Sequence, residues 1–451
     1  MSFSRYPEYK DSGVAWLGAV PSHWSVKRLR RVVQLNPSKS ETAALSRSSE
    51  VTFLPMEAIG EDGSLALDRL RPIGELESGY TYFAEGDVAI AKITPCFENG
   101  KGAVMRGLHG GLGFGTTELI VARPLSMHLD SGYLHRIFTA RPFMQQGEAS
   151  MYGAGGQKRV PDDFVRDFVI ALPPVDEQVV IKAFLDRETA KIDALVAEQE
   201  QLITLLKEKR QAVISHAVTK GLDPSVPMKD SGVEWLGEVP EHWQVNRLQR
   251  VVKPGTSVTY GIVQAGPDVE DGIPYIRTSD MAGDELPLDG YPKTSPEIDA
   301  SYARSKVSAG DLVIAIRATV GKCLPVPKEL DGANLTQGTA RIAPGLETDP
   351  GYLLAFINGN GAQTYFDRMA KGATFREITL EVLRKTPVLV PPLDEQFQIS
   401  SWVKQQSEQF LALIREAEQT QVLLKERRSA LISAAVTGQI DVRSLESPHA
   451  A

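Results

Sequence analysis

The sequence predicts an α+β protein in which two similar domains are joined by two long antiparallel coiled-coil helices. The segment DSGVAWLGAVPSHWSVKRLRRVV at 11–33 returns at 230–252, with 17 of its 23 positions identical. The hexapeptide Pro-Pro-x-Asp-Glu-Gln stands at 173–178 and returns at 391–396. Glycine and proline are absent from the 44 residues that begin at the aspartate of each hexapeptide. Such stretches, rich in Ala, Glu, Lys and Leu, each indicate one long helix.

The repeat is far longer than those of solenoid proteins, so each copy should be a whole domain with its connector. We expect the boundaries to follow the duplicated segments. The expected parts are a leading segment and first domain at 1–174, a first long helix at 175–220, a leading segment and second domain at 221–391, a second long helix at 392–438 and a C-terminal tail at 439–451. A duplicated domain suggests a function that needs two similar sites.

Composition narrows the class of protein. With 451 residues, 42% of them hydrophobic, each half can bury a sizeable core. The two cysteines are too few for a disulfide framework, and no apolar run suits a signal peptide or a membrane span, so we expect a soluble cytoplasmic protein. The net charge of -8 does not exclude nucleic-acid binding, because affinity depends on where Lys and Arg cluster.

Within each expected domain, short apolar runs alternate with turn residues. The runs at 87–93 and 311–317 are typical of short strands. Segments at 133–138 and 352–357 indicate amphipathic helices beside them. The domains should therefore be mixed α+β. In the leading segments we expect the aromatic residues to anchor the chain and the histidines to be packed and hydrogen-bonded. These residues are Trp16, His23, Trp24, Trp235, His242 and Trp243.

Both long helices are expected to begin by the same device. The proline pair ends the preceding strand, and Asp176 or Asp394 then stands where an N-cap carboxylate accepts free amide hydrogens. Apolar residues follow at alternating heptad spacing, which favours pairing of the two helices. They are Leu185, Ile192, Leu195, Leu202, Leu206 and Val213 in the first helix and Val403, Phe410, Leu413, Leu424 and Leu431 in the second. The alternative is that each helix packs flat on its own domain.

The order and duplication of these markers resemble one family, the specificity subunits of type I restriction-modification systems. The resemblance covers nearly the whole chain. It implies two target-recognition domains, each reading one half of a bipartite DNA site, held apart by a helical spacer that docks other subunits. The markers are the Trp-Leu-Gly…Pro…His-Trp segments, Gly86-Asp87 and Gly310-Asp311, the Pro-Pro-x-x-Glu-Gln helix starts, and Leu-Lys-Glu-Lys-Arg at 206–210 with Leu-Lys-Glu-Arg-Arg at 424–428.

The resemblance also implies partners and cofactors. The expected partners are double-stranded DNA, two modification (methyltransferase) subunits, and restriction subunits that translocate DNA and cut it. S-adenosylmethionine, ATP and Mg would belong to those subunits, and none of them to this chain.

Each recognition domain then needs cations for phosphates and amide or guanidinium side chains for base edges. Turn-prone loops supply both kinds of side chain in each half of the chain. The DNA-binding candidates are Lys92, Thr94, Asn99, Lys101, Gln157, Lys158 and Arg159 in the first domain, and Tyr260, Arg277, Ser279, Arg317, Thr319, Lys322, Asn334, Thr336, Gln337, Lys371, Thr374 and Arg376 in the second. Because the duplicated frames match while these loops differ, we expect a DNA site with two unlike halves.

No catalytic set is recognisable in the sequence. A Walker phosphate-binding loop is absent, and no histidine or cysteine spacing suits a zinc site. The proline pairs resemble part of the adenine methyltransferase signature, but Leu172 and Val390 precede them and cannot hydrogen-bond an adenine. We therefore expect a non-catalytic DNA-binding subunit. The alternative is a protein-only coiled-coil scaffold without DNA binding, which predicts no salt-dependent DNA affinity.

Overall fold

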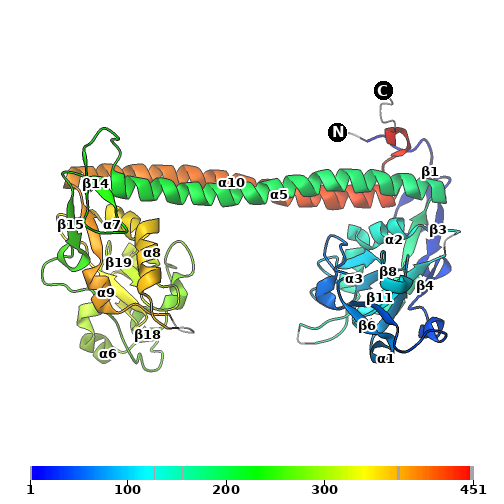
Figure 1. The fold of residues 1–451 in the computed structure, drawn as a ribbon, viewed down its shortest axis with the longest axis horizontal. Helices are drawn as coiled ribbons and strands as arrows, with labels where there is room; N and C mark the ends of the chain where they lie inside the picture. Colours follow the sequence, from blue (N-terminus) through cyan, green and yellow to red (C-terminus); the bar gives the residue numbers. More distant parts are fainter. Residues whose placement is uncertain (1–2, 126, 155, 373–375, 447–451) are drawn as a thin grey trace. The chain divides into compact units, whose positions relative to one another are not determined.

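The computed structural model describes residues 3–125, 127–154, 156–372 and 376–446 (Figure 1). The chain divides into two compact units: residues 1–199 with 419–451 form the first, and residues 200–418 form the second. The long helices α5 (Val175–Lys220) and α10 (Leu393–Val436) each contribute residues to both units. The mixed α+β class and the two long helices are as the sequence predicts.

Two four-stranded sheets form the centre of the first unit. One has the order β6 (Leu70–Pro72), β5 (Glu50–Leu54), β10 (Leu112–Gly115), β7 (Thr81–Ala84), with β5 and β10 parallel. The other is antiparallel, in the order β4 (Val33–Leu35), β11 (Leu119–Pro124), β8 (Val88–Ala91), β9 (Gly102–Val104). Two-stranded pairs are β1 (Tyr9–Asp11) with β2 (Ala19–Pro21) and β3 (Ser25–Arg28) with β12 (Val169–Leu172). The short helices are α1 (Ile73–Leu76), α2 (Ser131–Phe138), α3 (Arg141–Ala149) and α4 (Asp162–Asp167).

The second unit repeats much of this plan. Its antiparallel sheet β16 (Thr259–Tyr260), β22 (Thr339–Ile342), β19 (Leu312–Ala315), β20 (Cys323–Pro325) has the strand order of the β4 sheet. A smaller sheet is β18 (Lys293–Thr294), β17 (Ile273–Ile276), β21 (Asn334–Leu335). The pairs are β13 (Met228–Asp230) with β14 (Glu238–Pro240) and β15 (Gln244–Arg247) with β23 (Pro387–Val390). The short helices are α6 (Pro296–Ser301), α7 (Pro350–Ile357), α8 (Asn360–Met369) and α9 (Leu380–Lys385). The predicted strands β8 and β19 and helices α2 and α7 are confirmed.

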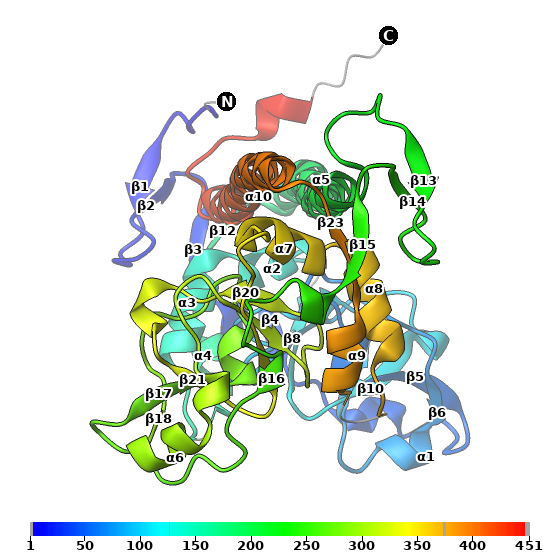
Figure 2. The same ribbon diagram turned by 90° about the vertical axis from the view of Figure 1, so that its left-hand side faces the viewer.

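Within each unit, α5 and α10 lie side by side and share the core of the mixed domain (Figures 1 and 2). In the first unit, Leu185 of α5 is buried in one cluster with Ile432 of α10. In the second, Val218 of α5 is buried in one cluster with Ile399 of α10. Figure 2 looks onto this second unit, where α7 lies directly beneath the helix pair. Each mixed domain is therefore built onto both helices.

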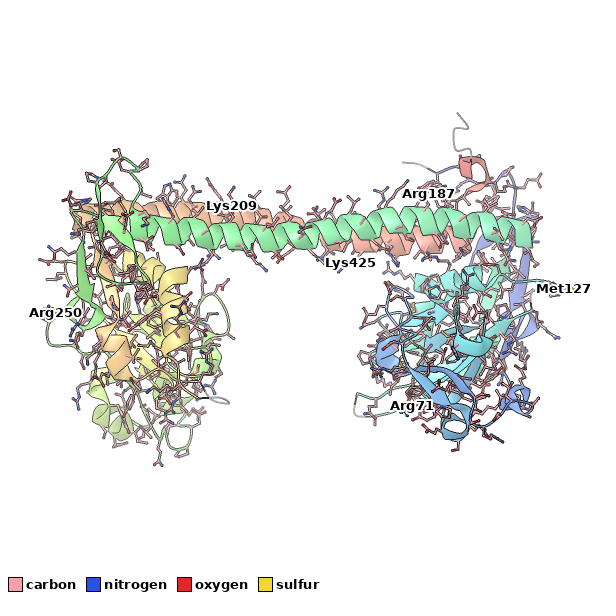
Figure 3. All side chains as sticks on the ribbon, in the orientation of Figure 1. Arg71, Met127, Arg187, Lys209, Arg250 and Lys425 are labelled. Carbon is pink, nitrogen blue, oxygen red and sulfur yellow. The ribbon has the colours of Figure 1, made fainter. Side chains whose placement is uncertain are left out.

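The heptad prediction is right only in part. Leu185, Ile192, Val403 and Leu431 are buried as predicted, whereas Leu195, Leu202 and Leu413 are exposed. Ile214, Ile414 and Ala417 are buried instead. The buried heptad residues belong to the cores of the mixed domains, whereas Leu195, Leu202 and Leu413 belong to neither core, so burial follows packing on the domains and not the heptad count. The outward faces carry charged side chains such as Arg187, Lys209 and Lys425 (Figure 3).

The start of each long helix also differs from the prediction. The helices begin at Val175 and Leu393, one residue before Asp176 and Asp394. Each aspartate therefore lies in the first helical turn and is not the N-cap residue. An acidic side chain there still favours the positive end of the helix dipole.

The glutamate of each hexapeptide fastens the leading segment to the long helix. Glu177 is buried, and its carboxylate accepts hydrogen bonds from Trp24 Nε1 (3.1 Å) and Tyr6 Oη (2.7 Å) and contacts His23 Nε2 (2.7 Å). Glu395 repeats the arrangement with Trp243 and His242. The distances there are 3.1 and 2.8 Å. Both tryptophans are fully buried, which confirms that these side chains anchor the leading segments.

The glutamine beside it fastens the mixed domain. Gln178 Oε1 accepts a hydrogen bond from the backbone N–H of Asp130 (2.8 Å), and its Nε2 donates to the carbonyls of His128 and Pro173 (both 2.9 Å). Gln396 forms the equivalent bonds with Asp349 N (2.9 Å), Glu347 O (3.1 Å) and Pro391 O (2.9 Å). We call Glu177 with Gln178, and Glu395 with Gln396, the Glu-Gln clusters.

The Gly-Asp markers hold the central sheets. Buried Asp87 accepts two hydrogen bonds from Arg123 on β11, at 2.6 and 2.8 Å. Asp311 pairs in the same way with Arg341 on β22, at 2.7 Å. Each pair joins the two middle strands of corresponding sheets in the two units. The Asp–Arg pair is therefore part of the structure that both units share, which we call the common frame.

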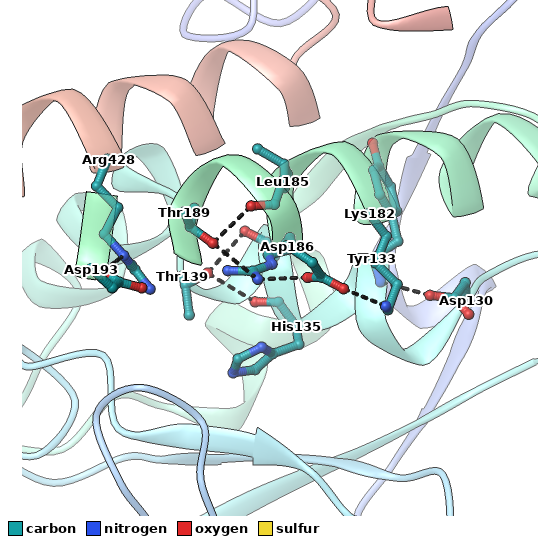
Figure 4. A network of polar contacts seen from close by, with 11 residues as sticks. Asp130, Tyr133, His135, Thr139, Lys182, Leu185, Asp186, Thr189, Asp193 and Arg428 are labelled. Carbon is teal, nitrogen blue, oxygen red and sulfur yellow. Dashed lines mark hydrogen bonds and ion pairs between the residues drawn. The ribbon is translucent and has the colours of Figure 1, made fainter. Parts of the chain in front are cut away.

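A further polar network is present in the first unit (Figure 4). Asp186 on α5 accepts hydrogen bonds from Arg136 of α2 (2.6 Å) and Lys182 (2.5 Å), and Arg428 of α10 pairs with Asp193 (2.7 Å). Burial opposes the charge of Asp186, but the bonds from Lys182 and Arg136 hold its pKa below the ordinary value. The aligned positions of Arg136, Lys182 and Asp186 in the second unit are Ala355, Ser400 and Lys404, so the network is not repeated there.

The C-terminal residues return to the leading segment of the first unit. The backbone N–H of Asp441 donates to Ser4 O (2.8 Å), and Tyr9 Oη donates to Gly438 O (2.9 Å). Val442 is buried, and the Arg443 guanidinium lies 4.8 Å from the centre of the Tyr6 ring. Residues from both ends of the sequence thus complete the first unit.

Among the described residues, no helix is long and apolar enough to cross a membrane.

Replacing Glu177 by Leu should lower the free energy of unfolding of the first unit by about 2 to 4 kcal/mol, because the buried Trp24 N–H and Tyr6 O–H lose their acceptor. Denaturant unfolding followed by tryptophan fluorescence measures the change. Glu395→Leu should act likewise on the second unit. Asp176→Asn, at the exposed neighbouring position, is the matched control. Equal unfolding midpoints for Glu177→Leu and Asp176→Asn would contradict the role given to the cluster.

Candidate nucleic-acid interface

In the first unit the two predicted loops form one patch. Arg159 makes β-bridges to both Ile93 and Tyr152. The backbone N–H of Thr94 donates to Lys158 O (3.0 Å), and the Lys158 N–H donates to Thr94 Oγ1 (3.1 Å). Segments some sixty residues apart in the sequence are thus joined at the carboxyl end of β8.

The side chains of this patch fall into two groups. Lys101 Nζ donates to Met56 O (3.1 Å) and Asn99 Nδ2 to Glu61 Oε1 (2.8 Å), so these two brace the 92–101 loop. Gln157 and Lys158 are exposed, and Lys92 is partly exposed. Among the described residues these three side chains form no hydrogen bond or ion pair, although Lys92 is near enough to Glu118 to help lower its pKa. They are the side chains most available to a ligand.

Arg159 is held by a carboxylate. Its Nε and Nη2 donate to Glu118 at 2.9 and 2.7 Å, a forked pair on the segment before β11. The hydrogen bonds from Arg159 hold the pKa of Glu118 below its ordinary value. The guanidinium is therefore fixed in one plane while its Nη1 side stays open.

In the second unit five separate segments converge. The segment after β19 bridges to the 371–377 segment through Arg317 and Glu377, and Glu377 also bridges to Lys371. Ile262, beside Tyr260, bridges to Thr336. The Thr336 N–H donates to Ile276 O (3.1 Å), which brings in Arg277 and Ser279. The loops chosen from sequence thus meet at one place on the sheet edge.

A glycine makes one of these approaches possible. A Cβ at Gly338 would lie 2.4 Å from Thr278 Oγ1, closer than real Cβ atoms come to a neighbour. The Ile316 N–H donates to Gly338 O at 2.9 Å. Glycine at this position therefore lets the 277–279 and 334–338 segments pack together.

The candidate side chains of the second unit differ in whether an acidic residue already holds them. Arg317 Nε pairs with Glu377 at 2.9 Å, and Arg277 forms a fork with Asp280 at 2.8 and 3.1 Å. Arg376 pairs with Asp367. The remaining described candidates are exposed Tyr260, Ser279, Thr319 and Lys371, and partly buried Lys322, Thr336 and Gln337, of which Lys322 Nζ donates to Ala282 O at 2.9 Å. Thr374 lies outside the described residues.

Asn334 is a correction to the predicted set. Its side chain is fully buried, donates to Asp299 Oδ1 (2.9 Å) and accepts from Ser305 Oγ (2.6 Å). An amide satisfied inside the protein cannot also reach a base edge. Asn334 therefore supports the fold, and we remove it from the candidates.

The sequence analysis missed the carboxylates that hold the arginines. Glu118, Asp280, Asp367 and Glu377 all lie within the interface, although acidic side chains repel phosphates. Glu118 stands 41 residues from Arg159 and gave no spacing signal, whereas Asp280 is only three residues from Arg277 and could have been found. In the first unit the arginine is Arg159, on the segment that bridges to Ile93 after β8. At the equivalent junction of the second unit the arginine is Arg317, which itself follows β19.

Comparison with known proteins agrees with this architecture. Residues 240–423 match the model of the family described as the type I restriction modification DNA specificity domain. The specificity subunit of the Escherichia coli type I restriction enzyme EcoEI is 38% identical over 195 residues, 43% of this chain and 32% of that subunit. The EcoAI subunit is 39% identical over 197 residues, 42% and 33% of the two chains. This chain thus matches about a third of the length of these two relatives.

Other likenesses span the whole chain. The putative MjaX specificity subunit of Methanocaldococcus jannaschii is 22% identical over 448 residues, 95% of this chain and 96% of that subunit. A chain from a structural study of type I R-M complex assembly matches with a TM-score of 0.74, covering 92% and 98% of the two chains. The HsdS subunit of Thermoanaerobacter tengcongensis matches with a TM-score of 0.56, covering 93% and 98%. Both structures are 19% identical and show a shared fold.

The duplicated frame, the convergent loops, the matched domain at 240–423 and the related subunits agree with one another. Residues 240–423 thus match the type I restriction modification DNA specificity domain, and the chain is similar over nearly its whole length to a type I specificity subunit.

Proposed function

We propose that this chain is the non-catalytic DNA-reading subunit of a type I restriction-modification complex, with one mixed domain reading each half of a bipartite site. The observation that carries the proposal is the convergence of the predicted loops at equivalent strand junctions in both units. The frames agree down to the Asp-Arg pairs, while the loop side chains differ. Two unlike reading surfaces on one frame suit a DNA site with unlike halves.

The held arginines are suited to reading guanine. A guanidinium can donate two parallel hydrogen bonds to O6 and N7 of guanine in the major groove, worth about 1 to 3 kcal/mol of discrimination. Glu118 and Glu377 each fix an arginine before DNA arrives, so less conformational entropy is lost on binding. We assign Arg159 and Arg317 to base reading, and exposed Lys158 and Lys371 to phosphates.

We assign the spacing between half-sites to the long helices. They have 46 and 44 residues, and at about 1.5 Å per residue each is roughly 65 to 70 Å long. Each helix contributes residues to both units, so a change in helix length would affect both recognition domains at once. We further propose that modification subunits, two per chain, and restriction subunits dock on this protein. S-adenosylmethionine, ATP and Mg would act in those subunits.

The competing function is a protein-only scaffold. It accounts for the long helices and the duplicated domains. It gives no reason for arginines, lysines and amides from five segments to gather at one junction. The scaffold predicts no salt-dependent affinity for DNA, whereas phosphate contacts make affinity fall steeply as salt rises.

The decisive experiment is to map methylated adenines in a host that carries this chain with its neighbouring modification subunit, and to repeat the map without this chain. We expect methylation on a two-part motif with a fixed gap, lost when the chain is omitted. An active modification subunit whose pattern ignores this chain would overturn the proposed function and favour the scaffold.

Arg317→Ala should weaken recognition of one half-site by about 5- to 150-fold, the equivalent of about 1 to 3 kcal/mol, because one base-reading fork is lost. Binding of the assembled complex to duplexes with either half-site altered measures the effect. Arg304→Ala, at an exposed arginine of the same unit outside the convergent segments, is the matched control. Equal loss on unrelated DNA would identify Arg317 as a phosphate contact.

Inserting Glu-Ala-Leu-Lys after Glu198 in α5, with the same four residues after Val422 in α10, should change the gap of the methylated motif or abolish methylation. The Asp193–Arg428 pair gives the helix register in the first unit, so the two insertions lengthen both helices together. The control is Glu198→Ala with Val422→Ala, which changes the surface and not the length. An unchanged gap after insertion would refute the assignment of spacing to the helices.

A further inference from the structure

Two of the twelve tyrosines stand out by exposure. Tyr152 is 62% exposed and Tyr260 is 43% exposed, one in each unit, while the other ten are buried or partly buried. Both lie in the segments that form the candidate interface. Tyr260 was selected from the sequence, whereas Tyr152 was not. The exposure of Tyr152 was therefore not predicted from the sequence.

The Tyr152 backbone is firmly placed. Its N–H donates to Arg159 O (3.1 Å), and the Arg159 N–H donates to Tyr152 O (2.9 Å). Arg159 bridges in turn to Ile93 after β8. The ring therefore projects from a short antiparallel ladder attached to the central sheet, and not from the tip of a loop.

A glycine in a left-handed conformation follows Tyr152. Gly153 has φ near +125°, and a Cβ there would lie 2.7 Å from Gln157 O. Only glycine fits this turn without displacing backbone. The turn brings Gln157 and Lys158 back beside the tyrosine.

Cations and an open aromatic ring thus occur together. Arg159 lies close enough to Tyr152 for the two to interact electrostatically, and Lys158 is exposed next to it. Among the described residues no hydrogen-bond partner or ring contact is recorded for the Tyr152 side chain. Aromatic rings beside phosphate-binding cations are the usual platform for a base that has left its stack.

We infer that Tyr152 is a DNA-binding residue whose ring stacks on a base of the first half-site. This inference rests on the proposed function. Tyr260 performs the same task in the second half-site, but from β16, an edge strand, whose counterpart in the first unit is β4. The two rings therefore come from different elements of the same frame, and each half-site is opened at a different position.

The test uses this chain assembled with its modification subunit and a duplex that carries the methylated motif. Tyr152→Ala should weaken binding to that duplex about tenfold, because stacking on one base is lost. Tyr152→Phe keeps the ring and should bind within about threefold of the wild type. Met127→Ala, at another strongly exposed side chain of the first unit, should leave affinity unchanged. Because stacking accepts any base, methylation by Tyr152→Ala should be weaker and keep the same motif.

Other outcomes would separate a failure of this inference from a failure of the proposed function. Because the ring is exposed, the thermal midpoint of Tyr152→Ala should equal that of the wild type, so lost binding does not report unfolding. If the wild type reads the motif and Tyr152→Ala reads it equally well, the inference is wrong and the proposed function stands. If Tyr152→Ala fails to assemble with the modification subunit in size-exclusion chromatography, the ring contacts protein and the inference is wrong. If the wild type shows no DNA preference at all, the proposed function itself falls.

Discussion

A carboxylate at the start of each long helix, buried in Glu177 and partly buried in Glu395, holds the leading segment to the helix. Glu177 receives hydrogen bonds from a tyrosine and a tryptophan that precede it by about 150 residues or more, and Glu395 repeats the contact with Trp243. An ionised group in an apolar surrounding is costly unless every lone pair is used, so this carboxylate selects one placement of the leading segment. Gln178 and Gln396 then fix the mixed domain from the adjacent position.

The common frame and the reading surface use polar residues in opposite ways. In the frame, the pairs Asp87–Arg123 and Asp311–Arg341 join equivalent strands, and the Glu-Gln clusters match except for the bond from Tyr6 to Glu177. At the interface the pairs differ: Arg159 is held by Glu118, before β11, whereas Arg317 is held by Glu377, which stands where the first unit has Arg159. Because the frame supplies the stability, the loops on it are free to vary without loss of the fold. The extra network at Asp186 is an exception, since it strengthens the attachment of one domain only.

Much of this organisation could be predicted from the sequence. The duplication identified both units, and the glycine-free stretch gave the extent of α5, because helix composition is a local property. The loops were found because turns and polar residues also leave local signals. What could not be predicted depends on distant partners: the buried position of Asn334, the acidic neighbours of the arginines, and the exposure of Tyr152. The heptad count failed at Leu195, Leu202 and Leu413, which lie outside the cores of the mixed domains, because their burial depends on tertiary packing.

The way the first unit closes on itself bears on how the chain is made. Its core contains Leu431, Ile432, Ala435 and Val436, and its leading segment pairs with Asp441. Residues 200–418, in contrast, form the second unit from one continuous stretch. During synthesis the first domain to emerge from the ribosome must therefore wait, with an apolar face uncovered, while the second is completed. The residues of α10 that close the first unit are thus translated after the whole of the second unit.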